Sequence, residues 1–197
     1  MKKIVTILSV ITLFVTCVNA QKTDDLLLEY GAKAGVNFST AKTSGSGSSG
    51  SISGTGVLIG GYVAFPITDV IKIQPELLYD HHSGTDNGMT TNLNYLTVPV
   101  IAKYAIQSSG FSVLAGPQIG LLLSAKSKEN GESISTKEFY NSTNFSLIIG
   151  AEYALPVGIN FSARYNAGLS NISKVSIDGN SEKLSAFAIS IGYRLSK

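Results

Sequence analysis

Residues 159–169 read Ile-Asn-Phe-Ser-Ala-Arg-Tyr-Asn-Ala-Gly-Leu, so apolar side chains alternate with polar or small ones along the whole stretch. Strict alternation predicts a β-strand whose two faces lie in different environments, because successive side chains of a strand point to opposite sides. The length, about ten residues, suits one tilted crossing of a bilayer. This stretch therefore predicts a membrane-spanning strand with one apolar and one polar face.

The composition of the 197-residue chain favours a membrane barrel. Hydrophobic residues make up 44% of it and charged residues only 14%, against roughly a quarter charged in ordinary soluble domains. Glycine is abundant, at 20 residues. Few charges without a long apolar helix are typical of a β-barrel in which half of each strand faces lipid.

The first 20 residues have the pattern of a secretory signal peptide. Met-Lys-Lys is followed by an apolar run from Ile4 to Val18 and then by Ala20. This pattern predicts cleavage before Gln21 and export across the inner membrane. The alternative is a true membrane helix, for which the apolar run is short.

Removal of residues 1–20 changes the charge and the cysteine content. Lys2 and Lys3 are lost with the signal, which leaves 13 basic and 13 acidic residues and a net charge of zero. This balance gives no indication of a nucleic-acid partner. The single cysteine, Cys17, is also lost, so the mature chain is predicted to form no disulfide.

The alternation recurs along the chain and predicts an all-β fold, an eight-stranded antiparallel up-and-down transmembrane β-barrel. A signal peptide at 1–20 and a periplasmic lead-in at 21–29 precede a barrel domain at 30–197. Long polar connections, including a flexible Gly/Ser/Thr loop at 40–55 and a charged loop at 125–141, alternate with tight turns, as in barrels with long extracellular loops. The predicted strands are residues 30–39, 56–65, 71–81, 92–104, 111–124, 142–153, 159–169 and 183–195.

Alternation alone does not say which face lies inside. A soluble lipocalin-like barrel would place the apolar face inside. Here the polar faces combine glycines with a few long charged side chains, which fits the narrow, filled interior of an eight-stranded barrel. We therefore predict an apolar face toward lipid and an interior polar cluster of Lys33, Lys72, Gln74, Glu76, Lys103, Gln118, Glu152, Arg164 and Arg194.

Aromatic residues on the apolar faces favour the same orientation. They gather toward both ends of the predicted strands, as do the aromatic girdles at the two interfaces of a bilayer-spanning barrel. The girdle predicted on the short-turn side consists of Tyr30, Phe65, Tyr104, Phe111, Tyr153 and Tyr193. The set nearer the long loops consists of Phe38, Tyr79, Phe145 and Phe187.

Five short stretches carry a family resemblance: GAKAGVN at 31–37, QPELLY at 74–79, LNYLTVP at 93–99, AGPQIG at 115–120 and ARYNAGL at 163–169. With them, nearly all of the mature chain resembles the PorT-like outer-membrane β-barrel family of Bacteroidetes. The resemblance implies export to the bacterial outer membrane, insertion by the barrel-assembly machinery, and no cofactor. An outer-membrane location also implies contact with lipid and lipopolysaccharide.

The interior charges admit two interpretations, a plug or a narrow path that favours anions. Unpaired buried charges are costly, and eight-stranded lumens are usually closed. We therefore expect a plug in which Glu76 and Glu152 pair with some of Lys103, Arg164 and Arg194. A small porin-like channel for ions or small solutes is the alternative.

His81 and His82, flanked by Asp80 and Ser83, are the candidates for chemistry. By parity His81 faces outward beside Tyr79, where a lipid-modifying enzyme could place a catalytic histidine. Neighbouring side chains of a strand point to opposite faces, so adjacency supports neither a shared metal nor a base–nucleophile pair. We therefore predict no catalytic, metal or cofactor-binding residue. The expected role is that of a non-enzymatic structural or interaction component of the cell envelope, with another envelope protein as a candidate partner of its extracellular loops.

Overall fold

The computed structural model describes residues 28–44, 49–86, 88–107, 109–129, 132–174 and 181–196. The predicted signal peptide and most of the predicted lead-in lie outside these residues. Among the described residues, no helix is long and apolar enough to cross a membrane. The elements are β1 (Glu29–Ser44), β2 (Ser49–Pro66), β3 (Ile71–Asp86), β4 (Met89–Ala105), β5 (Phe111–Glu129), β6 (Glu132–Ser135), the 3₁₀ helix η1 (Lys137–Phe139), β7 (Thr143–Ala154), β8 (Ile159–Gly168) and β9 (Ser181–Arg194).

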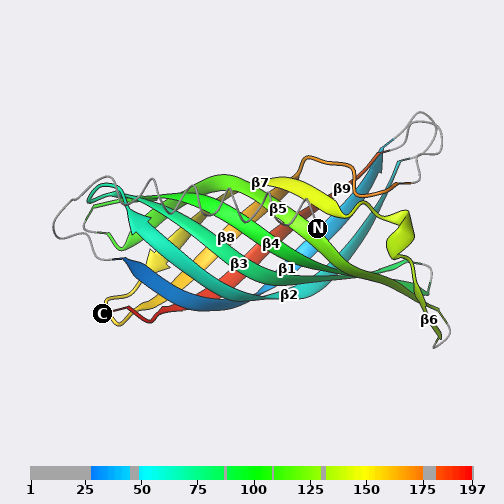
Figure 1. Ribbon diagram of the computed structural model, residues 1–197, viewed down its shortest axis with the longest axis horizontal. Coiled ribbons are helices and arrows are strands. Elements are labelled where there is room, and N and C mark those ends of the chain that lie inside the picture. The colour runs from blue at the N-terminus through cyan, green and yellow to red at the C-terminus, as the bar shows by residue number, and fades with distance from the viewer. Residues whose placement is uncertain are drawn as a thin grey trace, which may run out of the picture.

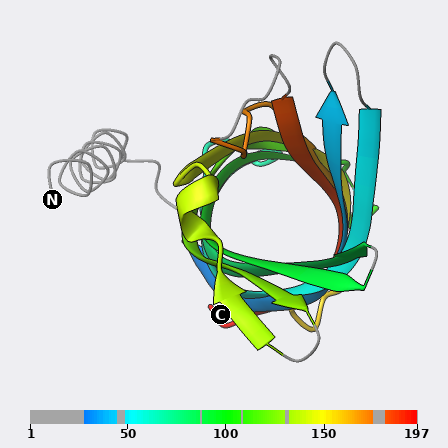
Figure 2. The same cartoon turned by 90° about the vertical axis from the view of Figure 1, so that its right-hand side faces the viewer.

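Eight of the nine described strands close into one antiparallel barrel (Figures 1 and 2). Their order around the barrel is β1, β2, β3, β4, β5, β7, β8 and β9, and β9 pairs back with β1. In the described part of the chain, β6 pairs with β5 alone and stands outside the ring. The predicted eight-stranded antiparallel barrel is therefore confirmed.

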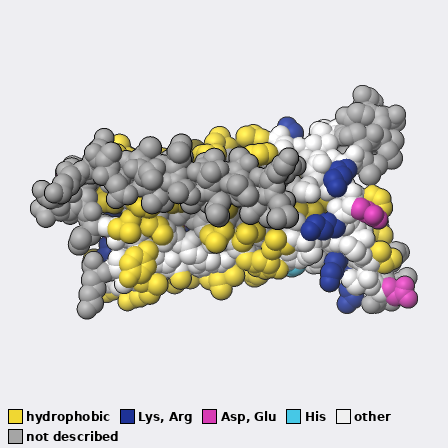
Figure 3. Space-filling model, viewed as in Figure 1, with side chains coloured by type: hydrophobic (Ala, Val, Ile, Leu, Met, Phe, Trp, Pro, Cys, Tyr) yellow, Lys and Arg dark blue, Asp and Glu magenta, His cyan; other side chains and the backbone are white. Residues whose placement is uncertain are grey.

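The side chains of β8 show which face is inside. Asn160, Ser162 and Arg164 are buried, whereas Phe161 and Tyr165 are exposed. Hydrophobic side chains cover much of the outer wall along the middle of the barrel (Figure 3). The predicted orientation, with the apolar face outward, is confirmed.

A glycine on the inner face makes room for the longest buried cation. Gly150 lies opposite Arg164 in the β7–β8 register. A Cβ atom built at Gly150 would lie 2.4 Å from the carbonyl oxygen of Ala163 and 3.0 Å from Cγ of Arg164. A side chain at this position would therefore displace that of Arg164.

Tight turns connect the strands at one end of the barrel, which we call the short-turn end. Gly110 and Gly158, in the turns before β5 and β8, have φ angles of 74° and 91°. Glycine adopts this left-handed region without the strain that a Cβ atom would cause. The C-terminus lies at the same end (Figure 1), where Arg194 Nη1 donates to Glu29 Oε1 at 3.0 Å.

At the opposite, long-loop end the strands are longer than predicted. β1 and β2 pair as far as Ser44 and Ser49, so most of the predicted flexible loop at 40–55 is a hairpin. β3 and β4 extend in the same way into the predicted loop at 82–91. Gly, Ser and Thr show no apolar alternation there. The backbone hydrogen bonds between the strands do not require apolar alternation, because the membrane-embedded part of the strands has already set their register.

The predicted charged loop at 125–141 is also partly ordered. β5 continues to Glu129 and pairs with β6, and η1 follows β6 at the rim of the barrel (Figure 2). Four register pairs join β5 to β6, from Lys126↔Ser135 to Glu129↔Glu132. A polar sequence therefore forms structure here because an existing strand edge satisfies its backbone groups.

The exposed aromatic residues bound the apolar wall. On β1, Phe38 follows Tyr30 by eight residues, or about 27 Å along a strand and about 20 Å along the membrane normal at the usual tilt. That is close to the ~25 Å apolar band of outer-membrane barrels. In the predicted short-turn girdle Phe65 is half-buried, and the exposed members are Tyr30, Tyr104, Phe111, Tyr153 and Tyr193. The set at the other boundary, also exposed, is Phe38, Tyr79, Phe145 and Phe187.

Candidate functional site

A charged bridge spans the middle of the lumen. Arg164 on β8 donates from Nη1 and Nη2 to the two carboxylate oxygens of Glu76 on β3, both at 2.8 Å. In the ring of eight strands β3 and β8 lie opposite each other, so this bidentate pair crosses the barrel. Lys33 Nζ on β1 contacts Glu76 Oε1 at 3.0 Å, and Gln74 Nε2 donates to the same oxygen at 2.7 Å. We call Lys33, Gln74, Glu76 and Arg164 the central bridge.

The other predicted interior charges form pairs nearer the short-turn end. Lys103 donates to Glu152, which is 3% exposed. Lys72 and Arg194 do not join either of these groups. They contact the two carboxylate oxygens of Glu29, at 2.8 and 3.0 Å, and their side chains remain 23% and 41% exposed.

Glu29, which lies outside the apolar wall, was not among the predicted interior charges. Burial raises the pKa of its carboxyl group, but the hydrogen bonds and charges of Lys72 and Arg194 outweigh this effect and lower that pKa overall. The two cations therefore keep Glu29 ionised at the rim. Because β1 begins at Glu29 and β9 ends at Arg194, the pairing also joins the two ends of the closed sheet.

A polar group and a small cavity lie on the long-loop side of the central bridge. Asn37 Nδ2 donates to Asp80 Oδ1 at 2.7 Å, and His82 Nε2 lies 3.4 Å from Asp80 Oδ2. The cavity, of about 20 Å³, is lined by Gln118, Arg164 and neighbouring side chains. This volume is close to that of one water molecule, so it makes no continuous channel.

An apolar cluster lies in the long-loop mouth of the barrel. Ile172, in the connection between β8 and β9, is 0% exposed and packs into the opening. It packs with residues from three strands, namely Leu93, Tyr95, Leu122, Ala125 and Leu184. We call this group the mouth plug.

Hydrogen bonds from the β5–β7 connection hold the mouth plug in place. The backbone N–H of Asn141 donates to the carbonyl of Ile172 at 2.7 Å, and Nδ2 of Asn141 donates to the carbonyls of Asn171 and Ser173. Burial raises the pKa of Glu182 and, together with the charge of Glu182, that of Tyr140 beside the plug. Sequence reasoning missed Ile172 because it assigned the segment to a polar loop. An isolated isoleucine between polar residues was the only signal.

The histidine pair divides between the two faces. His82 points inward and is 7% exposed, whereas His81 is partly exposed on the outer face. His81 Nδ1 and the hydroxyl of Tyr79 both lie 2.7 Å from Asn94 Oδ1. Within the described residues, no hydrogen bond joins His81 to Ser83, and no three His, Cys, Asp or Glu side chains are grouped to hold a metal. His81 and Ser83 therefore do not form a base–nucleophile pair.

The fold is similar to those of solved outer-membrane proteins. Neisserial surface protein A (NspA) superposes with a TM-score of 0.63 at 15% identity, over 83% of this chain and 96% of that one. Ail, the attachment invasion locus protein of Yersinia pestis, solved with the heparin analogue sucrose octasulfate, superposes with a TM-score of 0.51 at 16% identity, over 86% and 100%. At these identities the likeness shows the fold alone.

Sequence comparison points the same way. No curated protein matches the sequence significantly. The family model described as outer membrane protein beta-barrel domain matches residues 19–174, which is well over half of the chain. The closed eight-stranded barrel, its apolar outer wall and its aromatic boundaries agree with that description. The chain therefore belongs to the outer membrane protein beta-barrel domain family.

Proposed function

We propose that this chain is a non-enzymatic barrel of the PorT-like type with a closed lumen, and that its long-loop end faces the outside of the cell. It acts there as a structural or interaction component of the envelope. The observation that carries the proposal is the bond from Arg164 to Glu76 across the lumen. With the central bridge across the lumen and Ile172 buried at the mouth, the long-loop end is the surface that we propose for contacts.

The reach of the long-loop end supports this role. β5 has 19 residues, whereas a tilted strand crosses the hydrocarbon core in about 9–11. The excess adds roughly 20 Å of paired strand beyond the membrane at ~3.4 Å per residue and the usual tilt. β6 extends the sheet beside it and leaves Ile134 65% exposed. The part of β5 and β6 that lies beyond the membrane can contact another envelope molecule while the barrel stays embedded in the membrane.

Three partners follow from the proposal. Outer-membrane lipid and lipopolysaccharide surround the apolar wall, the barrel-assembly machinery inserts the chain, and an envelope protein contacts the long-loop end. The exposed side chains of Phe38 and Phe187, in register on β1 and β9, support the lipid contact. Aromatic rings are favoured at such a membrane boundary.

The purified protein in a planar bilayer is expected to pass no ionic current, because the central bridge and the mouth plug block the lumen in series. The measurement is single-channel recording, with a porin of known conductance as the positive control in the same membranes. Uniform current steps whose size changes in Arg164→Gln would show that the interior conducts. That result would favour the pore over the closed barrel.

Two cysteine variants test which end faces outward. The predicted mature chain has no cysteine, so Ile134→Cys on β6 and Val157→Cys in a short turn each introduce one thiol. Both positions are well exposed, at 65% and 67%. On intact cells, a membrane-impermeant maleimide is expected to label the Ile134→Cys variant alone, and both variants after lysis. Labelling of only the Val157→Cys variant on intact cells would reverse the proposed orientation.

A further inference from the structure

Two lysines stand side by side on the outer face near the long-loop end. Lys42 on β1 and Lys183 on β9 are direct register partners, and both are exposed. Like charges directly opposite each other on neighbouring strands destabilise a sheet. Among the described residues, no carboxylate lies within salt-bridge distance of either ammonium group. Glu182, the neighbour of Lys183, belongs to the inner face beside Tyr140.

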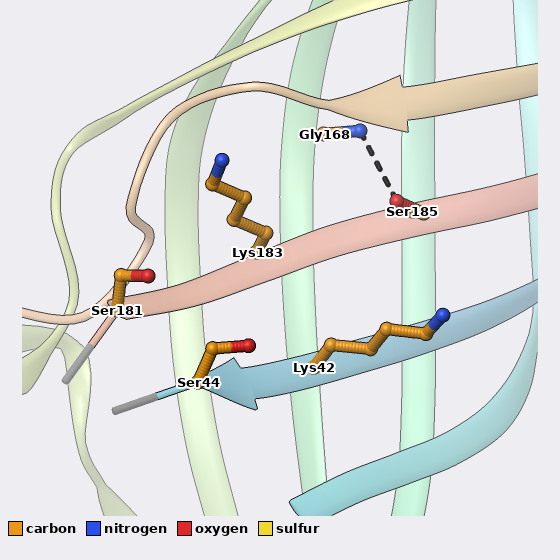
Figure 4. Close-up of a pocket in the computed structure, with 6 residues that line it drawn as sticks. All are labelled: Lys42, Ser44, Gly168, Ser181, Lys183 and Ser185. Carbon is orange, nitrogen blue, oxygen red and sulfur yellow. Dashed lines mark hydrogen bonds between the residues drawn. The ribbon is translucent and has the colours of Figure 1, made fainter. Parts of the chain in front are cut away.

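The two lysines line a recess in the outer wall (Figure 4). It forms where β8 ends at Gly168 while β9 continues to Ser181, so part of the β9 edge has no β8 partner. The volume of the recess is about 230 Å³, below the ~300–1,000 Å³ of sites for drug-sized molecules. It therefore suits one compact chemical group.

Hydroxyl groups complete the lining of the recess. Ser44, Ser181 and Ser185 stand beside the two lysines (Figure 4). The Ser185 hydroxyl accepts a hydrogen bond from the N–H of Gly168 at 3.2 Å, so its own proton is left to donate. The two lysine side chains extend in different directions from their neighbouring positions (Figure 4), and their flexible stems allow both ammonium groups to turn toward the recess. Two ammonium groups and several hydroxyl donors without a described anion are the partners that a tetrahedral oxyanion such as phosphate requires.

The height of the recess on the barrel identifies the source of that oxyanion. Phe38 and Phe187, a register pair, mark the outer edge of the apolar wall. Lys42 and Lys183 lie four residues farther along the same strands, which is roughly 10 Å higher along the membrane normal. Headgroups occupy roughly this layer just outside the hydrocarbon core. Lysines at that level place their ammonium groups among lipid phosphates.

We infer that the recess lined by Lys42 and Lys183 binds a phosphate group of an anionic outer-leaflet lipid. The bound phosphate relieves the repulsion between the two ammonium groups and fixes one lipid at the β8–β9–β1 side of the barrel. This inference rests on the outward placement of the long-loop end made under the proposed function. The cysteine-labelling experiment tests that placement separately.

Native mass spectrometry of the detergent-solubilised full chain tests the inference. The probes are phosphorylated lipid A and the same lipid with its phosphates removed. The wild type is expected to retain the phosphorylated lipid preferentially. Lys42→Gln and Lys183→Gln should each weaken its binding about fivefold, and the double variant about 25-fold, from the usual contribution of one lysine near an anionic surface.

A second pair of lysines provides the matched control. Lys126 and Lys128 on β5 are also exposed at the long-loop end, but their β4 register partners are Asn92 and Thr90. The Lys126→Gln/Lys128→Gln double variant loses the same charge and is expected to bind the phosphorylated lipid as the wild type does. An equal loss in both double variants would show a non-specific charge effect and overturn the inference.

Three probes in the same experiment distinguish a lipid phosphate from other sources of the anion. Equal retention of the dephosphorylated lipid would overturn the inference. Displacement of the lipid by inorganic phosphate at the same concentration as the lipid would also overturn it, because that result would indicate a site for free phosphate. A sulfated oligosaccharide that binds through Lys42 and Lys183 while lipid does not would place the ligand outside the membrane and also overturn it.

The stability of the unliganded protein gives an independent readout. In phosphate-free neutral detergent, added salt is expected to raise the melting temperature of the wild type, because it screens the repulsion between Lys42 and Lys183. The Lys42→Gln variant should melt no lower than the wild type and show a smaller salt effect. A lower melting temperature with an unchanged salt effect would mean that the two lysines do not repel each other, which contradicts the inference.

Discussion

Glu76→Gln is expected to lower the free energy of unfolding by about 3–5 kcal/mol, the usual cost of removing one partner from a buried ion pair. Glu76 is 3% exposed and forms ion pairs with both Lys33 and Arg164. Its loss would leave two buried cations without the carboxylate that both of them contact. The free energy of unfolding is measured by urea-induced unfolding in detergent micelles. The heat resistance of the folded band on a gel is a second, independent measurement.

Glu29→Gln is the matched control for Glu76→Gln. It makes the same chemical change in a carboxylate that also contacts two cations, but at the partly exposed short-turn rim. Ion pairs open to solvent contribute roughly 0–1 kcal/mol, so a much smaller loss is expected. Equal losses in the two variants would mean that the central bridge is not buried as the structure has it.

Ile149→Arg is expected to cost about 2–4 kcal/mol, the penalty for a cation on the lipid face at the bilayer midplane. Ile149 is 60% exposed and lies midway along β7 between Phe145 and Tyr153, which mark the two boundaries of the apolar wall. The measurement is reversible unfolding in lipid vesicles, because detergent would let the arginine reach water more easily.

Val157→Arg is the control for the lipid-face substitution. Val157 is 67% exposed in the short turn before β8, outside the apolar wall. Surface changes of this kind usually stay within about 0.5 kcal/mol. If Ile149→Arg proved as mild as Val157→Arg, the exposed apolar band would not face hydrocarbon, and the membrane assignment would fail.

Glu76 and Arg164 show where sequence reasoning ends. The alternation assigns both to the inner face, because a strand has a period of two and its faces can be told apart residue by residue. Which residue each charged side chain pairs with depends on how the sheet closes into a barrel. Eight strands in this order bring β8 opposite β3, so Arg164 reaches Glu76 across the lumen, and Arg194 pairs with Glu29 instead of an interior glutamate.

The long-loop end illustrates the second limit. Residues 40–55 contain no apolar alternation, and Ile172 lies between the polar residues Asn171 and Ser173. In the structure most of the first segment is paired in β1 and β2, and Ile172 is buried in the mouth plug. The first outcome depends on backbone hydrogen bonds to a neighbouring strand, and the second on apolar side chains from distant segments. A local sequence pattern contains no information about either contact.

The sequence by itself determined that this chain forms an eight-stranded barrel with its apolar face outward, because the alternation, the kinds of residue on each face and the rhythm of turns are local properties. Only the tertiary structure decided that Glu76 forms an ion pair across the lumen, that Ile172 is buried in the mouth and that Lys42 lies beside Lys183. These contacts join residues far apart in the chain, and the register and closure of the sheet bring them together.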